Sequence, residues 1–113
     1  MKKQTLAIHT AYPSKDAYGA LSMPVYHAAA YEFDNAADMA DAFCGRVTAP
    51  DYSRVMNPTV MNLENRVKAL TGAQAVVALN SGMAAISNTL LALASAGKNI
   101  VSSRHMFGNT YSL

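Results

Sequence analysis

The segment 75–102 constrains the fold of this chain more than any other, because two short apolar runs flank a helix-forming stretch. The run 75–79 is rich in valine, which favours a buried strand. The turn 80–82 (Asn-Ser-Gly) follows, and a helix is expected from there to about Ala96, before a second strand at 99–102. Apolar residues recur over this helix at helical spacing, at Met83, Ile86, Leu90 and Leu93. Strand, helix and strand with short links form a right-handed parallel unit, so the sequence predicts an α/β fold.

Two further helices are predicted upstream from their capping residues. Asn57 followed by Pro58 indicates a helix start, because asparagine caps free N–H groups and proline loses nothing at the first helical position. Apolar residues follow at helical spacing, at Val60, Leu63, Val67 and Leu70. Gly72 then closes the helix. A shorter helix is expected to begin after Asp34 or Asn35.

Residues 1–33 show no sustained period and are punctuated by Pro13, Gly19 and Pro24, so an extended arm with turns is expected. The arm carries four tyrosines, Tyr12, Tyr18, Tyr26 and Tyr31. An arm this rich in tyrosine more often lies on a surface than floats free. The sequence therefore predicts an arm over residues 1–56 and the start of an α/β domain over residues 57–113.

The chain has few charges for its length. Charged residues make up 14% of its 113 residues and hydrophobic residues 51%, whereas globular chains average about 25% charged. Disorder is therefore not expected, and much of the surface is expected to be covered by more chain or by partner subunits. The net charge is +2 without a basic cluster, which argues against a nucleic-acid-binding face.

Neither a membrane nor a metal is expected as a partner. No apolar run approaches the length that spans a bilayer, and the chain begins without the apolar segment of a signal peptide, so a cytoplasmic protein is expected. The single cysteine, Cys44, fits a reducing compartment. His9, His27 and His105 lack the spacing of metal ligands, which favours core or surface histidines.

The turn Ser81-Gly82-Met83 joins the end of the first predicted strand to the start of a helix. First-turn N–H groups have no partner inside a helix, and the helix dipole places about half a positive charge there. Gly82 lets a ligand approach the backbone and Ser81 adds a hydroxyl donor, so the turn can bind an anion, best a phosphate. The alternative is a tight turn without a ligand. The glycines of a dinucleotide or Walker A loop are missing, so nucleotide binding loses support.

Two other groups can serve such a site. Tyr52 and Arg54 alternate, so in an extended chain both side chains point the same way and both can donate to one phosphate. The alternative is an exposed pair on a surface loop. Phe107 follows the second predicted strand, at the same sheet edge as Ser81, and can stack on a planar ring. The alternative for Phe107 is a core side chain.

Together these motifs resemble a known family. The segments YSRVMNPTV, LNSGMAAISNTL and FGNTYSL, with GALSMPVY and YEF before them, are similar to the Cys/Met-metabolism family of pyridoxal 5'-phosphate (PLP) enzymes. The likeness covers almost the whole chain in order and favours the O-acetylhomoserine sulfhydrylase (aminocarboxypropyltransferase) branch. It implies a fold-type I α/β large domain, as in aspartate aminotransferase. This chain would hold the N-terminal arm and the first βαβ portion of that domain.

The resemblance also implies roles for the candidate residues. The backbone of Gly82 and Met83, with Ser81 beside it, would hold the phosphate of PLP. Tyr52 and Arg54 match the pair that reaches across a subunit interface to a neighbour's cofactor. That match implies a homo-oligomer, a dimer or a tetramer, and makes the arm an inter-subunit segment.

Phe107 marks a departure from the family. Many members have a tyrosine here that stacks on the pyridine ring and assists at the leaving group. Phenylalanine keeps the stacking face and loses the hydroxyl. The resemblance therefore puts an acid role at this position in doubt and favours sulfhydrylase over lyase chemistry.

The activity implied for the whole enzyme is replacement at the γ-carbon of an amino acid. Acetate leaves O-acetyl-L-homoserine and sulfide or a thiol adds, which gives homocysteine or methionine. The chain lacks the region with the family's cofactor-bearing lysine, so none of its residues is expected to be catalytic, and the chain alone is expected to have no turnover. Two alternatives stay open: cystathionine γ-synthase or γ-lyase chemistry, or a non-catalytic phosphate-binding or interaction fragment.

Overall fold

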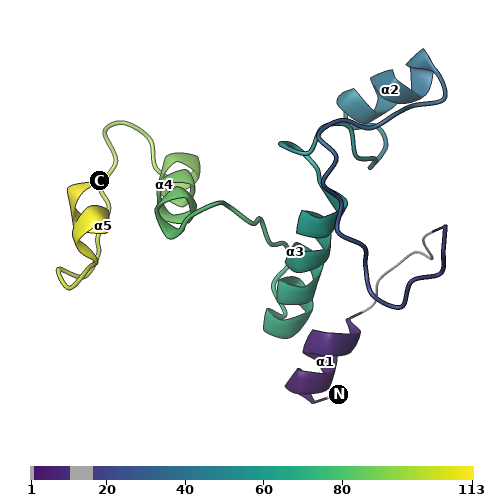
Figure 1. The fold of residues 1–113 in the computed structure, drawn as a ribbon. Helices are drawn as coiled ribbons and strands as arrows, with labels where there is room; N and C mark the ends of the chain where they lie inside the picture. The colour runs from purple at the N-terminus through teal and green to yellow at the C-terminus, as the bar shows by residue number, and fades with distance from the viewer. Residues whose placement is uncertain (1, 11–16) are drawn as a thin grey trace. The chain divides into compact units, whose positions relative to one another are not determined.

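The structure is a computed structural model that describes residues 2–10 and 17–113. These residues form five helices (Figure 1): α1 (Lys3–His9), α2 (Ala36–Phe43), α3 (Pro58–Thr71), α4 (Gly82–Leu93) and α5 (Gly108–Ser112). The chain divides into two compact units, Met1–Val76 and Val77–Leu113. The first unit contains α1 to α3 and the second contains α4 and α5. The predicted boundary between an arm and a domain after residue 56 stays a prediction.

The helix α3 confirms the capping prediction at both ends. The Asn57 side chain accepts hydrogen bonds from the N–H groups of Thr59 and Val60, and Pro58 takes the first helical position. Gly72 stands at the other end with φ 73°, a left-handed conformation in which glycine has no side chain to clash. The start and the end of α3 are therefore set by residues next to them in the sequence.

The helix α2 follows the same rule at its start. Of the two caps proposed, Asn35 is the one used, and its side chain accepts from the N–H of Asp38. The cap explains why α2 begins at Ala36, the residue directly after Asn35. Ala42 on α2 is the only buried residue among those described, at 9% exposure.

The helix α4 is shorter than predicted. It ends at Leu93 instead of about Ala96, because Ala94 takes an extended conformation with φ −105° and ψ 145°. The next residues form a separate turn, which the Lys98 N–H closes on the Ser95 carbonyl at 3.1 Å. Gly97, with φ 82°, belongs to that turn. Gly97 therefore forms part of this turn and does not end α4.

The helix α1 corrects the prediction of an extended arm at residues 3–9. No side chain caps its start, and it packs against α3 instead. Arg66 on α3 donates from Nη1 to the Ala7 carbonyl at 3.1 Å, near the end of α1 where a cation is favourable. This support comes from residues 59 positions away, which local sequence signals do not reveal. Tyr12 and Pro13 of the predicted arm lie outside the described residues.

The two predicted strands do not pair in this structure. Within residues 2–10 and 17–113, the one β pairing is an isolated antiparallel bridge between Ala30 and Tyr52. Val77 is 75% exposed and Val101 is 96% exposed, so neither run is covered. Parallel strands of α/β proteins are buried on both faces and need neighbours on both sides. The strand–helix–strand unit is therefore absent here as a sheet, and the local apolar pattern alone does not build one.

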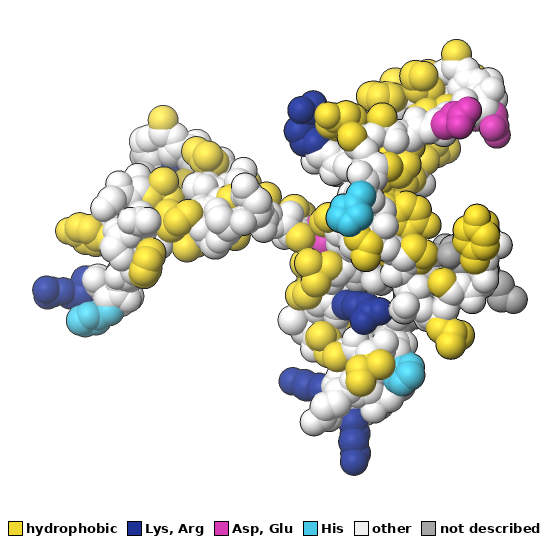
Figure 2. Space-filling view, in the orientation of Figure 1, with side chains coloured by type: hydrophobic (Ala, Val, Ile, Leu, Met, Phe, Trp, Pro, Cys, Tyr) yellow, Lys and Arg dark blue, Asp and Glu magenta, His cyan; other side chains and the backbone are white. Residues whose placement is uncertain are grey.

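Much of the apolar surface of each unit faces solvent, as the yellow side chains in Figure 2 show. The chain exposes 9307 Å², whereas a compact monomer of 12.0 kDa exposes about 6,000 Å². Leu91 and Leu93 on α4 are 79% and 85% exposed. The low charge content predicted such a surface. No helix of the described residues is long and apolar enough to cross a membrane.

Candidate functional site

The start of α4 offers free hydrogen-bond donors. Ser81 caps the helix, and its Oγ accepts from the N–H of Ala84 at 3.1 Å. In the described part of the chain, no hydrogen bond engages the N–H groups of Gly82 or Met83. These two amides and the helix dipole favour an anion at this end of α4.

The space in front of these amides is open. A Cβ placed on Gly82 would meet no heavy atom within 4 Å, so the side of the backbone where a side chain would stand is open. The Ser81 hydroxyl uses an acceptor site for the cap and keeps its hydrogen to donate elsewhere. Two amides and a hydroxyl on consecutive residues therefore remain available as donors, which is the donor chemistry that a phosphate group needs. The start of α4 lies where the sequence predicted it.

Tyr52 and Arg54 lie together in the first unit. The Arg54 guanidinium stacks over the Tyr52 ring, with Cζ 4.9 Å from the ring centroid. The segment is a turn rather than the extended chain assumed from the alternation, because the N–H groups of Val55 and Met56 both bond to the Tyr52 carbonyl, at 2.8 and 2.9 Å. The turn still brings the phenol and the guanidinium to one side. The pair can therefore present two donors to one anion.

Asn57 and Ser53 hold this turn, and the sequence did not reveal that function. The Asn57 Nδ2 donates to Ser53 Oγ at 2.8 Å and to the carbonyl of Tyr26 at 3.0 Å. Asn57 was recognised only as a helix cap. Its other partner lies 31 residues upstream, beyond the reach of local patterns.

Phe107 is a surface residue in this structure and not a core side chain. It is 75% exposed and stands immediately before α5. The helix α5 packs against α4, and the Thr110 hydroxyl lies 3.7 Å from the Met83 sulfur. The segment that carries Phe107 is therefore attached to a residue at the start of α4. The exposed ring is available to stack on a planar ligand.

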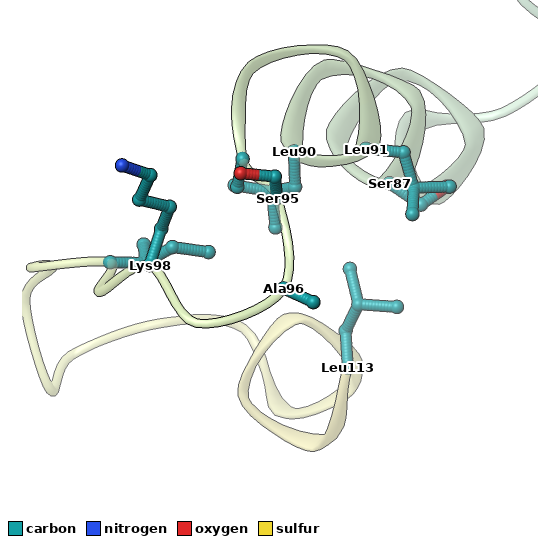
Figure 3. Close-up of a pocket in the computed structure, with 9 residues that line it drawn as sticks. Ser87, Leu90, Leu91, Ser95, Ala96, Lys98 and Leu113 are labelled. Atoms are coloured by element: carbon teal, nitrogen blue, oxygen red, sulfur yellow. The ribbon is translucent and has the colours of Figure 1, made fainter.

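An apolar hollow lies at the other end of α4 (Figure 3). It encloses about 380 Å³, and Leu90, Leu91, Ile100 and Leu113 contribute to its wall. Leu113 points toward α4, whereas the Lys98 ammonium points away from Leu113. Aliphatic walls suit other apolar side chains better than a phosphate. This hollow is therefore not part of the anion site.

The six predicted site residues form two groups. Ser81, Gly82, Met83 and the segment of Phe107 belong to the second unit, while Tyr52 and Arg54 belong to the first. Each group is held together within its own unit. Among the described residues, no three histidine, cysteine or acidic side chains are placed to share a metal ion.

Comparison with known proteins gives a consistent result. Residues 4–113 match the model of the family described as Cys/Met metabolism PLP-dependent enzyme. The chain is 39% identical over 110 residues to the O-acetyl-L-homoserine sulfhydrylase of Corynebacterium glutamicum, covering 97% of this chain and 25% of that protein. It is also 39% identical to an L-methionine gamma-lyase of Fusobacterium nucleatum subsp. polymorphum, covering 96% of this chain and 27% of that protein.

A solved structure shows the same likeness. The crystal structure of a putative O-acetylhomoserine (thiol)-lyase from Campylobacter jejuni, with N'-pyridoxyl-lysine-5'-monophosphate at position 205, matches with a TM-score of 0.90 and 36% identity. The match covers 99% of this chain and 27% of that chain. The chain thus spans about a quarter of the length of the relatives it matches. The family match and these identities establish that the chain belongs to the Cys/Met metabolism family of PLP-dependent enzymes.

Proposed function

We propose that this chain is the phosphate-binding portion of a PLP-dependent enzyme that replaces the γ-substituent of O-acetyl-L-homoserine by sulfide or a thiol. The start of α4 supports the proposal, because the amides of Gly82 and Met83 and the hydroxyl of Ser81 are consecutive donors there and nothing crowds Gly82. PLP supplies an electron sink for the substrate when it is bound. The amides of Gly82 and Met83 with the Ser81 hydroxyl would hold its phosphate and so fix its place.

Phe107 would orient the cofactor without taking part in proton transfer. Its ring is exposed and attached through α5 to the start of α4, so it is free to stack on the pyridine ring. A phenylalanine has no acidic hydrogen to give to a leaving group. Acetate is a good leaving group and needs little assistance, whereas the thiolate that a γ-lyase expels needs more. Phe107 therefore favours replacement of acetate over elimination of a thiol.

The second candidate is the γ-lyase reaction. An L-methionine gamma-lyase is as similar to this chain as the sulfhydrylase is, at 39% identity. Within this chain, the preference for γ-replacement over elimination rests on Phe107. The two reactions release different products, so an assay decides between them.

Tyr52 and Arg54 would bind the cofactor phosphate of a neighbouring subunit. Their stacked arrangement on an exposed turn supports this function, because the donors face outward from their own unit. The active assembly would then be a homo-oligomer in which each site takes donors from two subunits. The substrate would be a small amino acid.

A hybrid protein tests the proposed reaction. In the hybrid, this chain replaces the matching quarter of the Corynebacterium glutamicum sulfhydrylase. Purified hybrid is supplied with PLP and either O-acetyl-L-homoserine plus sulfide or L-methionine alone. Homocysteine from the first mixture supports γ-replacement. Release of 2-oxobutanoate from methionine as the dominant reaction would instead assign the lyase function.

The Phe107→Tyr hybrid is the matched control for the branch assignment. Restoring a hydroxyl at this position should raise the methionine elimination rate relative to homocysteine formation. An unchanged ratio of the two rates would show that position 107 does not select the reaction.

A further inference from the structure

We propose that Asn57 is a positioning residue for the Tyr52–Arg54 pair, and that it acts together with Ser53 and Tyr31. What the pair binds rests on the proposed function above, but the positioning itself does not. The inference comes from the amide group of Asn57, whose oxygen and nitrogen bond to different parts of the first unit.

The oxygen of the Asn57 amide serves the helix. It accepts from the N–H of Thr59 at 2.9 Å and from the N–H of Val60 at 3.4 Å. Serine and aspartate fulfil this function about as well as asparagine. The need for a helix cap therefore does not explain why the residue is asparagine.

The nitrogen of the same amide serves the segment that bears the pair. Nδ2 lies 2.8 Å from Ser53 Oγ, 3.0 Å from the Tyr26 carbonyl and 3.3 Å from the Tyr31 hydroxyl. An amide nitrogen has two hydrogens, so it can bridge partners on two segments at once. Among the common capping side chains, only that of asparagine offers both an acceptor and two donors here.

Ser53 is the centre of this network and the residue between Tyr52 and Arg54. Its hydroxyl donates to the Ala28 carbonyl, so its two lone pairs remain for incoming donors. One accepts from Asn57 Nδ2, and the other faces the Tyr31 hydroxyl at 3.0 Å. Since the serine hydrogen is already used, Tyr31 must be the donor in that contact. Every polar atom of this serine side chain is then satisfied.

The backbone fixes the same segment. The Ser53 N–H bonds to the Ala29 carbonyl at 2.9 Å, and Tyr52 bridges to Ala30. Because hydrogen bonds hold both the backbone and the side chain of Ser53, the turn that stacks Arg54 over the Tyr52 ring has few alternative conformations. Two donors arranged in advance lose less entropy when a phosphate binds than two free side chains do.

The first test measures the pair itself in the full chain, without any cofactor. Side-chain NMR resonances of Arg54 should show a ring-current shift from Tyr52. Asn57→Ser keeps the cap acceptor and removes the amide donors without adding charge. It should move the Arg54 resonances at least halfway toward random-coil positions, with the helix signal in circular dichroism unchanged. Asn35→Ser removes an equivalent cap amide from α2 and should leave Arg54 unchanged.

A second variant keeps the test decisive if Asn57→Ser disturbs α3. Tyr31→Phe removes one hydroxyl from the network and leaves the cap intact, and it should give a smaller shift of the Arg54 resonances in the same direction. If neither variant moves these resonances, Asn57 is only a helix cap and the inference is wrong.

The second test asks whether the positioning matters for phosphate. In the hybrid, Asn57→Ser should raise the dissociation constant of PLP about fivefold and leave that of pyridoxal, which has no phosphate, unchanged. A general loss of structure would weaken both ligands equally, which would overturn the inference. If Arg54 moves in the NMR test but both ligands bind as before, the positioning stands and the phosphate function proposed for Tyr52–Arg54 fails.

Discussion

The two units of this chain are held together in different ways. In the first, side-chain hydrogen bonds join segments 25 to 33 residues apart, as Ser53, Asn57 and Thr59 bond to the arm. In the second, the described contact between helices is the packing of α5 on α4, with one weak hydroxyl–sulfur contact. Polar networks define a local shape from few residues. Segments with an apolar surface, by contrast, take a defined arrangement only when other polypeptide packs against that surface.

The difference is informative about the site. The Tyr52–Arg54 pair rests on the network and can be arranged before any ligand arrives. The proposed phosphate site at the start of α4 needs only its own helix, but Val77 before α4, Leu93 at its last position and Val101 after it are exposed. The proposed binding groups are therefore encoded locally, whereas the predicted sheet depends on partner strands that the described residues do not supply.

The largest expected effect tests whether the second unit functions without that polypeptide. The chain alone, mixed with PLP, O-acetyl-L-homoserine and sulfide, should form no homocysteine above the rate without protein. The cofactor-bearing lysine of the Campylobacter jejuni relative stands at position 205 of that chain, in a part that this chain does not match. A stoichiometric cofactor absorption band at neutral pH from the chain alone would contradict this expectation. The hybrid is the positive control.

Hydrogen exchange compares the two units directly. The Ser53 amide, which bonds to Ala29, should exchange more than tenfold slower than the amides of Val77 and Val101, which are exposed and lie outside any helix or strand. The measurement is amide exchange followed by NMR or mass spectrometry. Equal protection in both regions would mean that the predicted strands are paired in solution, within or between molecules. Dilution then separates the two cases, because only pairing between molecules depends on concentration.

Ser81→Ala in the hybrid should raise the dissociation constant of PLP about tenfold. The substitution removes a hydroxyl donor to the phosphate and the cap on the Ala84 N–H, and the loss of a cap costs about 1 kcal/mol of helix stability. The measurement is titration of the cofactor-free hybrid by absorbance. Ser95→Ala, in the turn after α4, is the matched control and should change nothing. An unchanged affinity for Ser81→Ala would remove the serine from the proposed site.

Arg54→Lys in the hybrid should weaken PLP about threefold to fivefold, because lysine keeps the charge and loses the planar two-donor arrangement. The stacking on Tyr52 weakens as well. Arg46→Lys is the control, since Arg46 bonds only to Asp41 on the surface in the described part of the chain. If both lysine variants bind PLP equally well, Arg54 does not contact the phosphate.

The smallest effect concerns that surface ion pair. Arg46 Nε lies 2.6 Å from the Asp41 carboxylate, but the two side chains are 59% and 44% exposed. Exposed pairs contribute about 0.5 kcal/mol or less. Arg46→Ala should therefore lower the stability of the first unit by no more than this in urea denaturation. A larger loss would show that charges, and not only the amide network, hold the first unit together.

Local chemistry explains which parts of the fold the sequence could predict. Asn35 and Asn57 cap the helices that follow them, and Gly72 ends α3 as expected. The helix α1 was missed because α3, through Arg66, supports it from a distance. The predicted sheet is not formed by residues 2–10 and 17–113, because a strand exists only through partners elsewhere in the chain.

The candidate site divides in the same way. The donors at the start of α4 follow from one turn, so their position was predictable from Ser81-Gly82-Met83 alone. The sequence indicates the Tyr52–Arg54 pair but not its turn conformation, because Ser53 between them bonds to Ala28 and Tyr31, which are distant in the sequence. Local sequence patterns indicate the helix cap formed by the oxygen of Asn57. They do not indicate the hydrogen bonds that its nitrogen donates to residues distant in the sequence.

The exposed apolar run 75–79 has a practical consequence for handling this polypeptide. It is uncharged, rich in valine, free of proline and open to solvent, with Val77 at 75% exposure. Such a run is a template for cross-β growth between molecules. At high concentration the isolated chain would assemble into fibrils that bind thioflavin, starting from the residues meant for the centre of a sheet. Production together with the covering polypeptide would suppress this nucleation.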